Sequence, residues 1–154
     1  MIAPEEVITK LVLAKQGTDL HTATFNQVLT HEIAKDGFID QHVKTICRVY
    51  RERRDVMLDA LEEHMPAGVR WTHPEGGLFL WVTLPENFDT TEIFKLAVKE
   101  KVAFVPGEPF HPNGGGKNTM RLNFSYCKPD KINEGISRLG VVLKEQIRQN
   151  DPVF

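Results

Sequence analysis

A single helical pattern of about 25 residues restricts the folds open to this chain. Apolar side chains recur at three- and four-residue steps between Asp40 and Met65, and Pro66 ends the pattern. A helix of that length extends about 37 Å. One small core in a chain of 154 residues cannot cover it along its whole length. Arg53 falls on the apolar stripe, which indicates a contact beyond an ordinary core.

Two shorter amphipathic helices are predicted before it, over residues 4–17 and 23–35. The remaining pattern offers these two helices few partners, and residues 1–4 have the character of a continuation from earlier chain. After Gly68 the pattern changes to short strands, at residues 69–71, 78–84, 102–105 and 120–125, with helices starting near Asp89 and Pro129. The run 78–84 is continuously apolar, which predicts a strand covered on both faces.

This order of elements predicts an α+β fold. A small, mostly antiparallel sheet is covered by helices, and three helices precede it. Residues 151–154 are expected to form a frayed tail.

The last predicted strand carries one arginine between apolar neighbours. Met120, Leu122 and Phe124 alternate with Arg121, Asn123 and Ser125, and three glycines precede the strand. A guanidinium in that position suits a planar carboxylate, because its two N–H groups match the two oxygens and it never deprotonates. The pattern alone also fits an arginine on an edge strand facing water, and it leaves both interpretations open.

Charge and composition exclude several classes of function. The net charge of −2 argues against a nucleic-acid-binding protein, and the basic run 51–54 fits a solvated helix face. No apolar run reaches the roughly 18 residues of a membrane span, and the first residues lack the pattern of a signal peptide. Cys47 and Cys127 are not spaced as a paired motif, so we expect reduced thiols in a cytoplasmic protein.

Motifs for common site chemistries are also missing. The glycines before Lys117 fail the phosphate-loop pattern, since Asn118 stands where a hydroxyl is needed. The six histidines are scattered, so no metal site is expected, and no serine nucleophile elbow occurs. Gly76 and Gly77 could let a ligand approach the backbone closely, although a plain turn explains the pair equally well.

Five segments in register resemble a known family. They are Met1–Pro4, Lys15–Thr22, Pro74–Trp81, Val102–Gly107 and Met120–Ser125. Together they are similar to the carboxy-terminal part of fold-type I, pyridoxal-phosphate-dependent aminotransferases of class I/II, and most of all to the branch that resembles 2-aminoadipate aminotransferase. The resemblance extends over essentially the whole chain.

The resemblance implies roles for particular residues. Arg121 matches the arginine that binds the substrate α-carboxylate, and Gly76 and Gly77 match a segment on the substrate side of the site. Residues 1–37 would be the trailing helices of a large domain. Residues 38–154 would be a long interdomain helix followed by the small α+β domain. The complete enzyme would use pyridoxal phosphate, act on an amino acid and a 2-oxo acid, and form a homo-oligomer.

The sequence also departs from the family pattern. None of its eleven lysines has the sequence setting of the family's Schiff-base lysine. We therefore expect no catalytic or cofactor-binding residue in this chain, and no activity from the chain alone. The alternative is the effector-binding half of a transcription regulator with an aminotransferase-like domain, because the same motifs occur in both classes.

Overall fold

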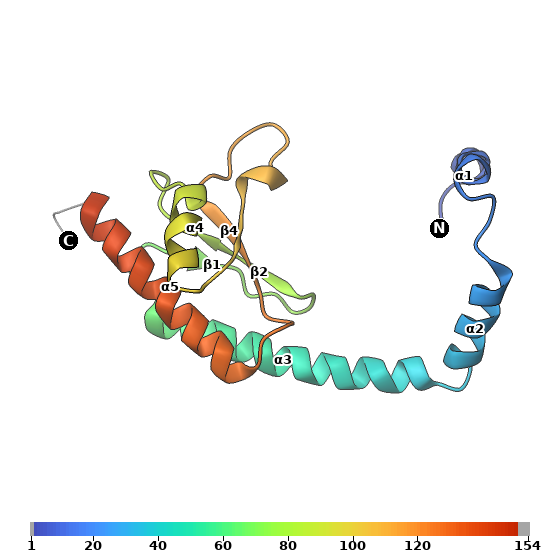
Figure 1. The fold of residues 1–154 in the computed structure, drawn as a ribbon, viewed down its shortest axis with the longest axis horizontal. Coiled ribbons are helices and arrows are strands. Elements are labelled where there is room, and N and C mark those ends of the chain that lie inside the picture. Colours follow the sequence, from blue (N-terminus) through green and yellow to red (C-terminus); the bar gives the residue numbers. More distant parts are fainter. Residues whose placement is uncertain (1, 151–154) are drawn as a thin grey trace. The chain divides into compact units, whose positions relative to one another are not determined.

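The computed structural model describes residues 2–150 and divides the chain into two compact units, Met1–Thr45 and Ile46–Phe154. The tail expected at residues 151–154 lies outside the described residues. Three helices come first, and a second part with four strands follows (Figure 1).

The first unit contains helices α1 (Glu5–Thr18) and α2 (Thr24–Ala34), as the sequence predicts. Neither helix has a buried residue. The apolar stripe of α2 is exposed, at Phe25, Val28, Leu29 and Ile33.

The long helix α3 (Phe38–His64) contains 27 residues. It starts two residues before Asp40, where the apolar pattern begins, and Asp40 lies in its first turn. Its buried residues are confined to its last third, at Met57, Ala60 and Leu61. The remainder of the helix exceeds what the core covers, as its length predicted.

The strands form one antiparallel sheet in the order β1-β2-β4-β3. β2 (Phe79–Thr83) and β4 (Thr119–Asn123) pair along their full lengths, whereas β1 (Arg70–Trp71) and β3 (Val105–Pro106) contain two residues each. The α+β prediction is therefore confirmed. The strand expected over residues 102–105 is shorter than predicted and lies later, at Val105–Pro106, so the two ranges share only Val105.

One face of this sheet carries the core (Figure 1). Leu80 and Val82 of β2 and Met120 and Leu122 of β4 pack in the same cluster as buried residues of α3, α4 (Thr90–Lys99) and α5 (Pro129–Asn150). The first turn of α4 is capped by the Asp89 carboxylate, which accepts a hydrogen bond from Thr91 N at 2.8 Å.

The opposite face of β2 is only partly covered. Phe79 is 38% exposed and Trp81 is half-buried. The prediction that the run 78–84 is covered on both faces is therefore wrong. A continuous apolar run does not distinguish a strand between two layers from one whose outer face carries aromatic residues for another purpose.

Candidate functional site

Arg121 lies in the middle of β4, which has a neighbouring strand on each side. It is opposite Trp81 of β2 and Val105 of β3. Since β4 is interior and Arg121 is half-buried, the edge-strand interpretation is wrong. The short β3 forms the true edge, and its two residues gave too weak a pattern to show this.

Two phenylalanines contact the Arg121 guanidinium. Its Cζ lies 4.0 Å from the ring centroid of Phe79 and 4.8 Å from that of Phe110. Both distances are in the range of favourable cation–π interactions. Phe79 shares the outer face of the sheet with Arg121, because alternate residues of paired strands point the same way.

No carboxylate in the described residues pairs with this arginine. The ion pairs of residues 2–150 all involve other side chains, and no hydrogen bond joins the Arg121 guanidinium to a protein acceptor there. Its Nε is buried without a partner. A cation that is held by aromatic rings and lacks an acidic partner can bind an external anion through its terminal nitrogens.

Phe110 reaches the sheet from a short 3-10 helix, η1 (Glu108–Phe110), that follows β3. The backbone anchors this turn to β4, because Gly107 N donates to Thr119 O at 2.8 Å. A Cβ at Gly107 would lie 1.8 Å from Thr119 Oγ1 and 2.8 Å from its carbonyl oxygen. Only glycine fits this approach without displacing the turn.

Gly76 and Gly77 lie elsewhere. They line a cavity of about 290 Å³ between α3 and the turn before β2, together with Tyr50 and Arg54. Arg54 Nη1 donates to Pro74 O at 3.1 Å, which ties the turn to the helix. Arg121 is not among the residues that line this cavity, so the structure does not bring the two predicted site elements into one pocket.

The basic run on α3 is also only partly a solvated face. Arg51 and Glu52 are exposed as expected, but Arg53 and Arg54 are half-buried and hydrogen-bonded to backbone carbonyls of other segments. That part of the prediction is wrong, since the two arginines contribute to packing.

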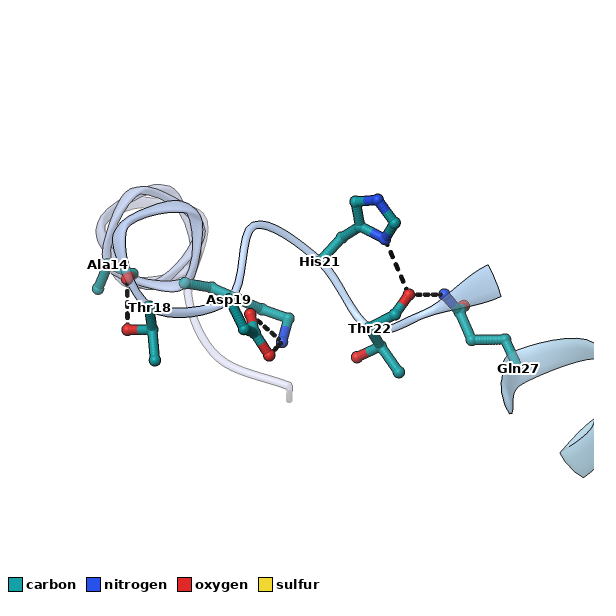
Figure 2. A network of polar contacts seen from close by, with 7 residues as sticks. Ala14, Thr18, Asp19, His21, Thr22 and Gln27 are labelled. Atoms are coloured by element: carbon teal, nitrogen blue, oxygen red, sulfur yellow. Dashed lines mark hydrogen bonds and ion pairs between the residues drawn. The ribbon is translucent and has the colours of Figure 1, made fainter. Parts of the chain in front are cut away.

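A polar network joins α1 to α2, and Figure 2 shows its contacts. Lys15 Nζ pairs with the Asp19 carboxylate at 2.8 Å, His21 Nδ1 lies 2.9 Å from Thr22 O, and Gln27 Nε2 donates to the same carbonyl at 2.7 Å (Figure 2). Most of these contacts are local and their side chains exposed. They fix the turn and do not form a cavity for a ligand.

Residues 2–150 contain no group of three or more histidine, cysteine or acidic side chains that could hold a metal ion. No helix in the same range is long and apolar enough to cross a membrane. None of the eleven lysines is buried, and Lys15, the most covered, pairs with Asp19.

Comparison with known proteins identifies the family. The family model for aminotransferase class I and II matches residues 1–139. The chain belongs to this family. It is 50% identical over 147 residues to aromatic-amino-acid aminotransferase 1 of Thermococcus litoralis, covering 96% of this chain and 35% of the relative.

Solved aminotransferases share the fold. The alpha-aminoadipate aminotransferase from Thermus thermophilus, complexed with N-(5'-phosphopyridoxyl)-L-leucine, superposes with a TM-score of 0.88 and 46% identity. The match covers 96% of this chain and 38% of that structure. The chain thus spans little more than a third of the length of these relatives.

Transcription regulators match more distantly. An HTH-type transcriptional regulator of Bacillus subtilis is 28% identical over 145 residues, covering 94% of this chain and 30% of the relative. This likeness explains why the motifs alone left the regulator alternative open.

The sequence interpretation missed the two phenylalanines beside Arg121. Phe79 was hidden in the apolar run of β2, where it counted as core. Phe110 lies outside every periodic element, between two prolines, so no pattern marked it. Phe110 is eleven residues before Arg121 in the sequence, so no local signal connects the two.

Proposed function

We propose that this chain supplies part of a pyridoxal-phosphate-dependent amino-acid aminotransferase, with Arg121 binding the substrate α-carboxylate. Residues 1–37 would belong to its large domain, and residues 38–154 would provide the interdomain helix and the small domain. Family membership and the shared fold support this role. The substrates would be an amino acid and a 2-oxo acid, as the names of the aminotransferase relatives suggest.

One observation supports the role of Arg121 above the others. Its guanidinium is half-buried against Phe79 and Phe110 and has no acidic partner in residues 2–150. A cation in partly apolar surroundings is costly without an anion, and a bound carboxylate would offset that cost. Since Nε is covered, the carboxylate would be received by the two terminal nitrogens.

The test replaces Arg121 by alanine and by lysine in the full-length enzyme. Loss of a charge-assisted, two-point contact should cost roughly 2–4 kcal/mol, about 30- to 1,000-fold in kcat/KM for α-amino acids. Lysine should restore little, because a point charge does not reproduce the planar group. Pyridoxal phosphate content should stay nearly normal, since the residues that hold the cofactor are expected outside this chain.

Arg70→Ala is the matched control, because Arg70 is an exposed arginine on β1 of the same sheet. Unchanged kcat/KM in Arg121→Ala would refute the carboxylate role. Loss of pyridoxal phosphate from that variant would show that Arg121 contributes to the cofactor side of the site, and not to the substrate side as proposed.

We also propose that the chain alone does not transaminate. The cofactor supplies an electron sink for the amino-acid carbanion when bound, and a buried lysine must hold it. The absence of a buried lysine among the eleven supports this proposal, since ten are exposed and Lys15 is half-buried. Borohydride treatment with pyridoxal phosphate should fix no label at a single lysine, and no amino group should reach a 2-oxo acid. Selective labelling of one lysine together with transfer activity would contradict the proposal.

Self-association is the third part of the proposal, because α1 and α2 expose apolar side chains that need cover.

The regulator alternative has weaker support from the distant regulator relative. Full-length kcat/KM separates the two, because an effector-binding regulator would bind the amino acid without turning it over.

A further inference from the structure

We propose that Phe110 is a positioning residue for Arg121, which holds the guanidinium plane in the orientation that receives a carboxylate. The inference rests on the proposed role of Arg121 and adds a second residue, on a different segment, to that site. Two observations support it. The rings of Phe79 and Phe110 both contact the Arg121 guanidinium, and backbone hydrogen bonds fix the turn that carries Phe110.

The ring of Phe110 is itself oriented by a neighbour. Trp81 meets it edge-to-face, with ring centroids 5.2 Å apart and planes at 88°. Trp81 also lies directly opposite Arg121 in the register of β2 and β4. The cation, the phenylalanine and the tryptophan therefore form one contiguous group on the outer face of the sheet, and a movement of Phe110 alters both contacts.

The loop of residues 107–116, which carries Phe110, is held in place by contacts within the loop and with Thr119. His111 Nδ1 lies 3.0 Å from Gly107 O, and Thr119 Oγ1 donates to Gly116 O at 2.7 Å. A Cβ at Gly116 would lie 2.1 Å from the His111 ring, so the imidazole packs directly on that glycine. These contacts hold both ends of the loop to the start of β4, two residues before Arg121.

Thr90 strengthens the same anchor. It is fully buried, and its hydroxyl donates to Thr119 O at 2.8 Å, the carbonyl that Gly107 N also reaches. The turn η1 is thus connected through one carbonyl to both β4 and the start of α4. Such an arrangement fixes a loop residue more firmly than its 43% exposure alone would indicate.

Without the Phe110 ring, the Arg121 guanidinium would keep one of the two rings that contact it in the described residues, that of Phe79. A long side chain with fewer contacts samples more rotamers, and ordering it at each binding event lowers the affinity for the anion. Leucine at position 110 keeps apolar cover but removes the π face. Tyrosine keeps the face. The pair Phe110→Leu and Phe110→Tyr therefore separates a cation–π role from plain packing.

The first measurement needs no ligand. In the 154-residue chain, NMR of the arginine side chains reports the shift of the Arg121 Nε–H group and the rotation about its Nε–Cζ bond. We expect a ring-current shift and slow rotation in the original chain and in Phe110→Tyr. Both features should weaken in Phe110→Leu, while the backbone amide spectrum of the core stays the same.

The second measurement titrates the chain with benzoate, with neutral benzamide as the matched probe. The readouts are the Arg121 shifts and the tryptophan fluorescence of a Trp71→Phe background, in which Trp81 is the remaining tryptophan. Phe110→Leu should weaken benzoate binding about 2- to 30-fold and leave benzamide unaffected. The same substitution in an Arg121→Ala background should have no further effect on benzoate.

The possible outcomes distinguish the positioning role of Phe110 from the carboxylate-binding role of Arg121. If Phe110→Leu leaves the Arg121 signals unchanged, or weakens benzoate equally with and without Arg121, Phe110 is not a positioning residue and the carboxylate role of Arg121 still stands. If the Arg121 signals respond to Phe110→Leu but benzoate never perturbs them, the positioning holds and the carboxylate role is what fails.

Discussion

Arg53 Nη1 donates a hydrogen bond to the carbonyl oxygen of Ser125, which lies 72 residues further along the chain. This contact joins the middle of α3 to the segment that follows β4. Asn123, the last residue of β4, also holds this segment, because its Oδ1 accepts a hydrogen bond from Ser125 N at 2.8 Å. The arginine that broke the apolar stripe of the helix thus satisfies a backbone acceptor just beyond the strand that carries Arg121.

Arg53→Met should therefore lower the free energy of unfolding. Methionine keeps most of the side-chain volume but leaves the Ser125 carbonyl without its donor, and hydrogen bonds to charged groups contribute about 1.5–3 kcal/mol. Denaturant unfolding at neutral pH measures the change. Arg48→Met, on an exposed position of the same helix, is the control and should change stability by no more than about 0.5 kcal/mol. Equal effects of the two substitutions would show that the Ser125 contact contributes nothing.

Replacing either of two glycines of α5 by alanine should change the free energy of unfolding, and the two changes should be opposite in sign. A Cβ at Gly135 would meet no atom within 4 Å, so Gly135→Ala should stabilise the helix by about 0.5–1 kcal/mol. A Cβ at the buried Gly140 would lie 2.5 Å from the carbonyl oxygen of His64, the last residue of α3. Gly140→Ala should therefore destabilise by about 1–3 kcal/mol.

Thermal and denaturant unfolding of both variants give the comparison, and each serves as the other's control because they share one helix. A stabilising Gly140→Ala would mean that α5 does not approach the end of α3 as closely as described.

The pKa of the Glu134 carboxyl is lowered by its hydrogen bond to Lys131, by the charge of Lys131 and by that of Arg138. A carboxyl with a lower pKa in the folded state stabilises the fold above its ordinary pKa of 4.5, and this stabilisation is lost as pH falls through the folded-state value. Glu134→Gln should thus be less stable than the original chain at neutral pH. The difference should shrink in acid.

Unfolding curves at neutral and acidic pH measure that difference, and NMR titration of Glu134 measures the pKa itself. The group is exposed, so the effect should be small and weakened by salt. A difference that grows on acidification would contradict the assigned sign.

Periodicity predicted most of the fold, because α3, α4, α5 and the two five-residue strands bury regular stripes. It located α3, α4, α5, β2 and β4, and it identified Asp89 as the start of α4. It failed where burial does not follow from local pattern. A strand was expected near β3, but its pattern does not say which strand it pairs with, and this pairing makes β4 an interior strand.

The site was predictable in part for a similar reason. Arg121 stood out as the only charge in an apolar strand, and family resemblance gave it a role to test. The contact with Phe110 depends on a turn held by Gly107, Thr119 and Thr90, which are up to 29 residues apart in sequence. Backbone hydrogen bonds of this kind leave no mark on hydropathy, so only the structure brings the ring to the cation.

The last prediction concerns the exposed face of α2. Phe25, Val28, Leu29 and Ile33 are each between 46% and 74% exposed and share one helix face by their spacing. Apolar patches of this kind usually bind a partner, and a second copy is the partner present in a pure sample. The 17.5 kDa chain should therefore sediment as a larger species at high concentration and bind a hydrophobic dye.

Replacing Phe25 and Leu29 together by serine should shift sedimentation toward the monomer and reduce dye binding, because two of the four apolar side chains of the patch are lost. Serine also lowers helix propensity, so circular dichroism must show that α2 persists. Tyr126→Ser is the matched control, since Tyr126 is 87% exposed but lies on a loop of the second unit. A monomer in the original chain would rule out self-association. A double variant that still associates would move the contact away from α2.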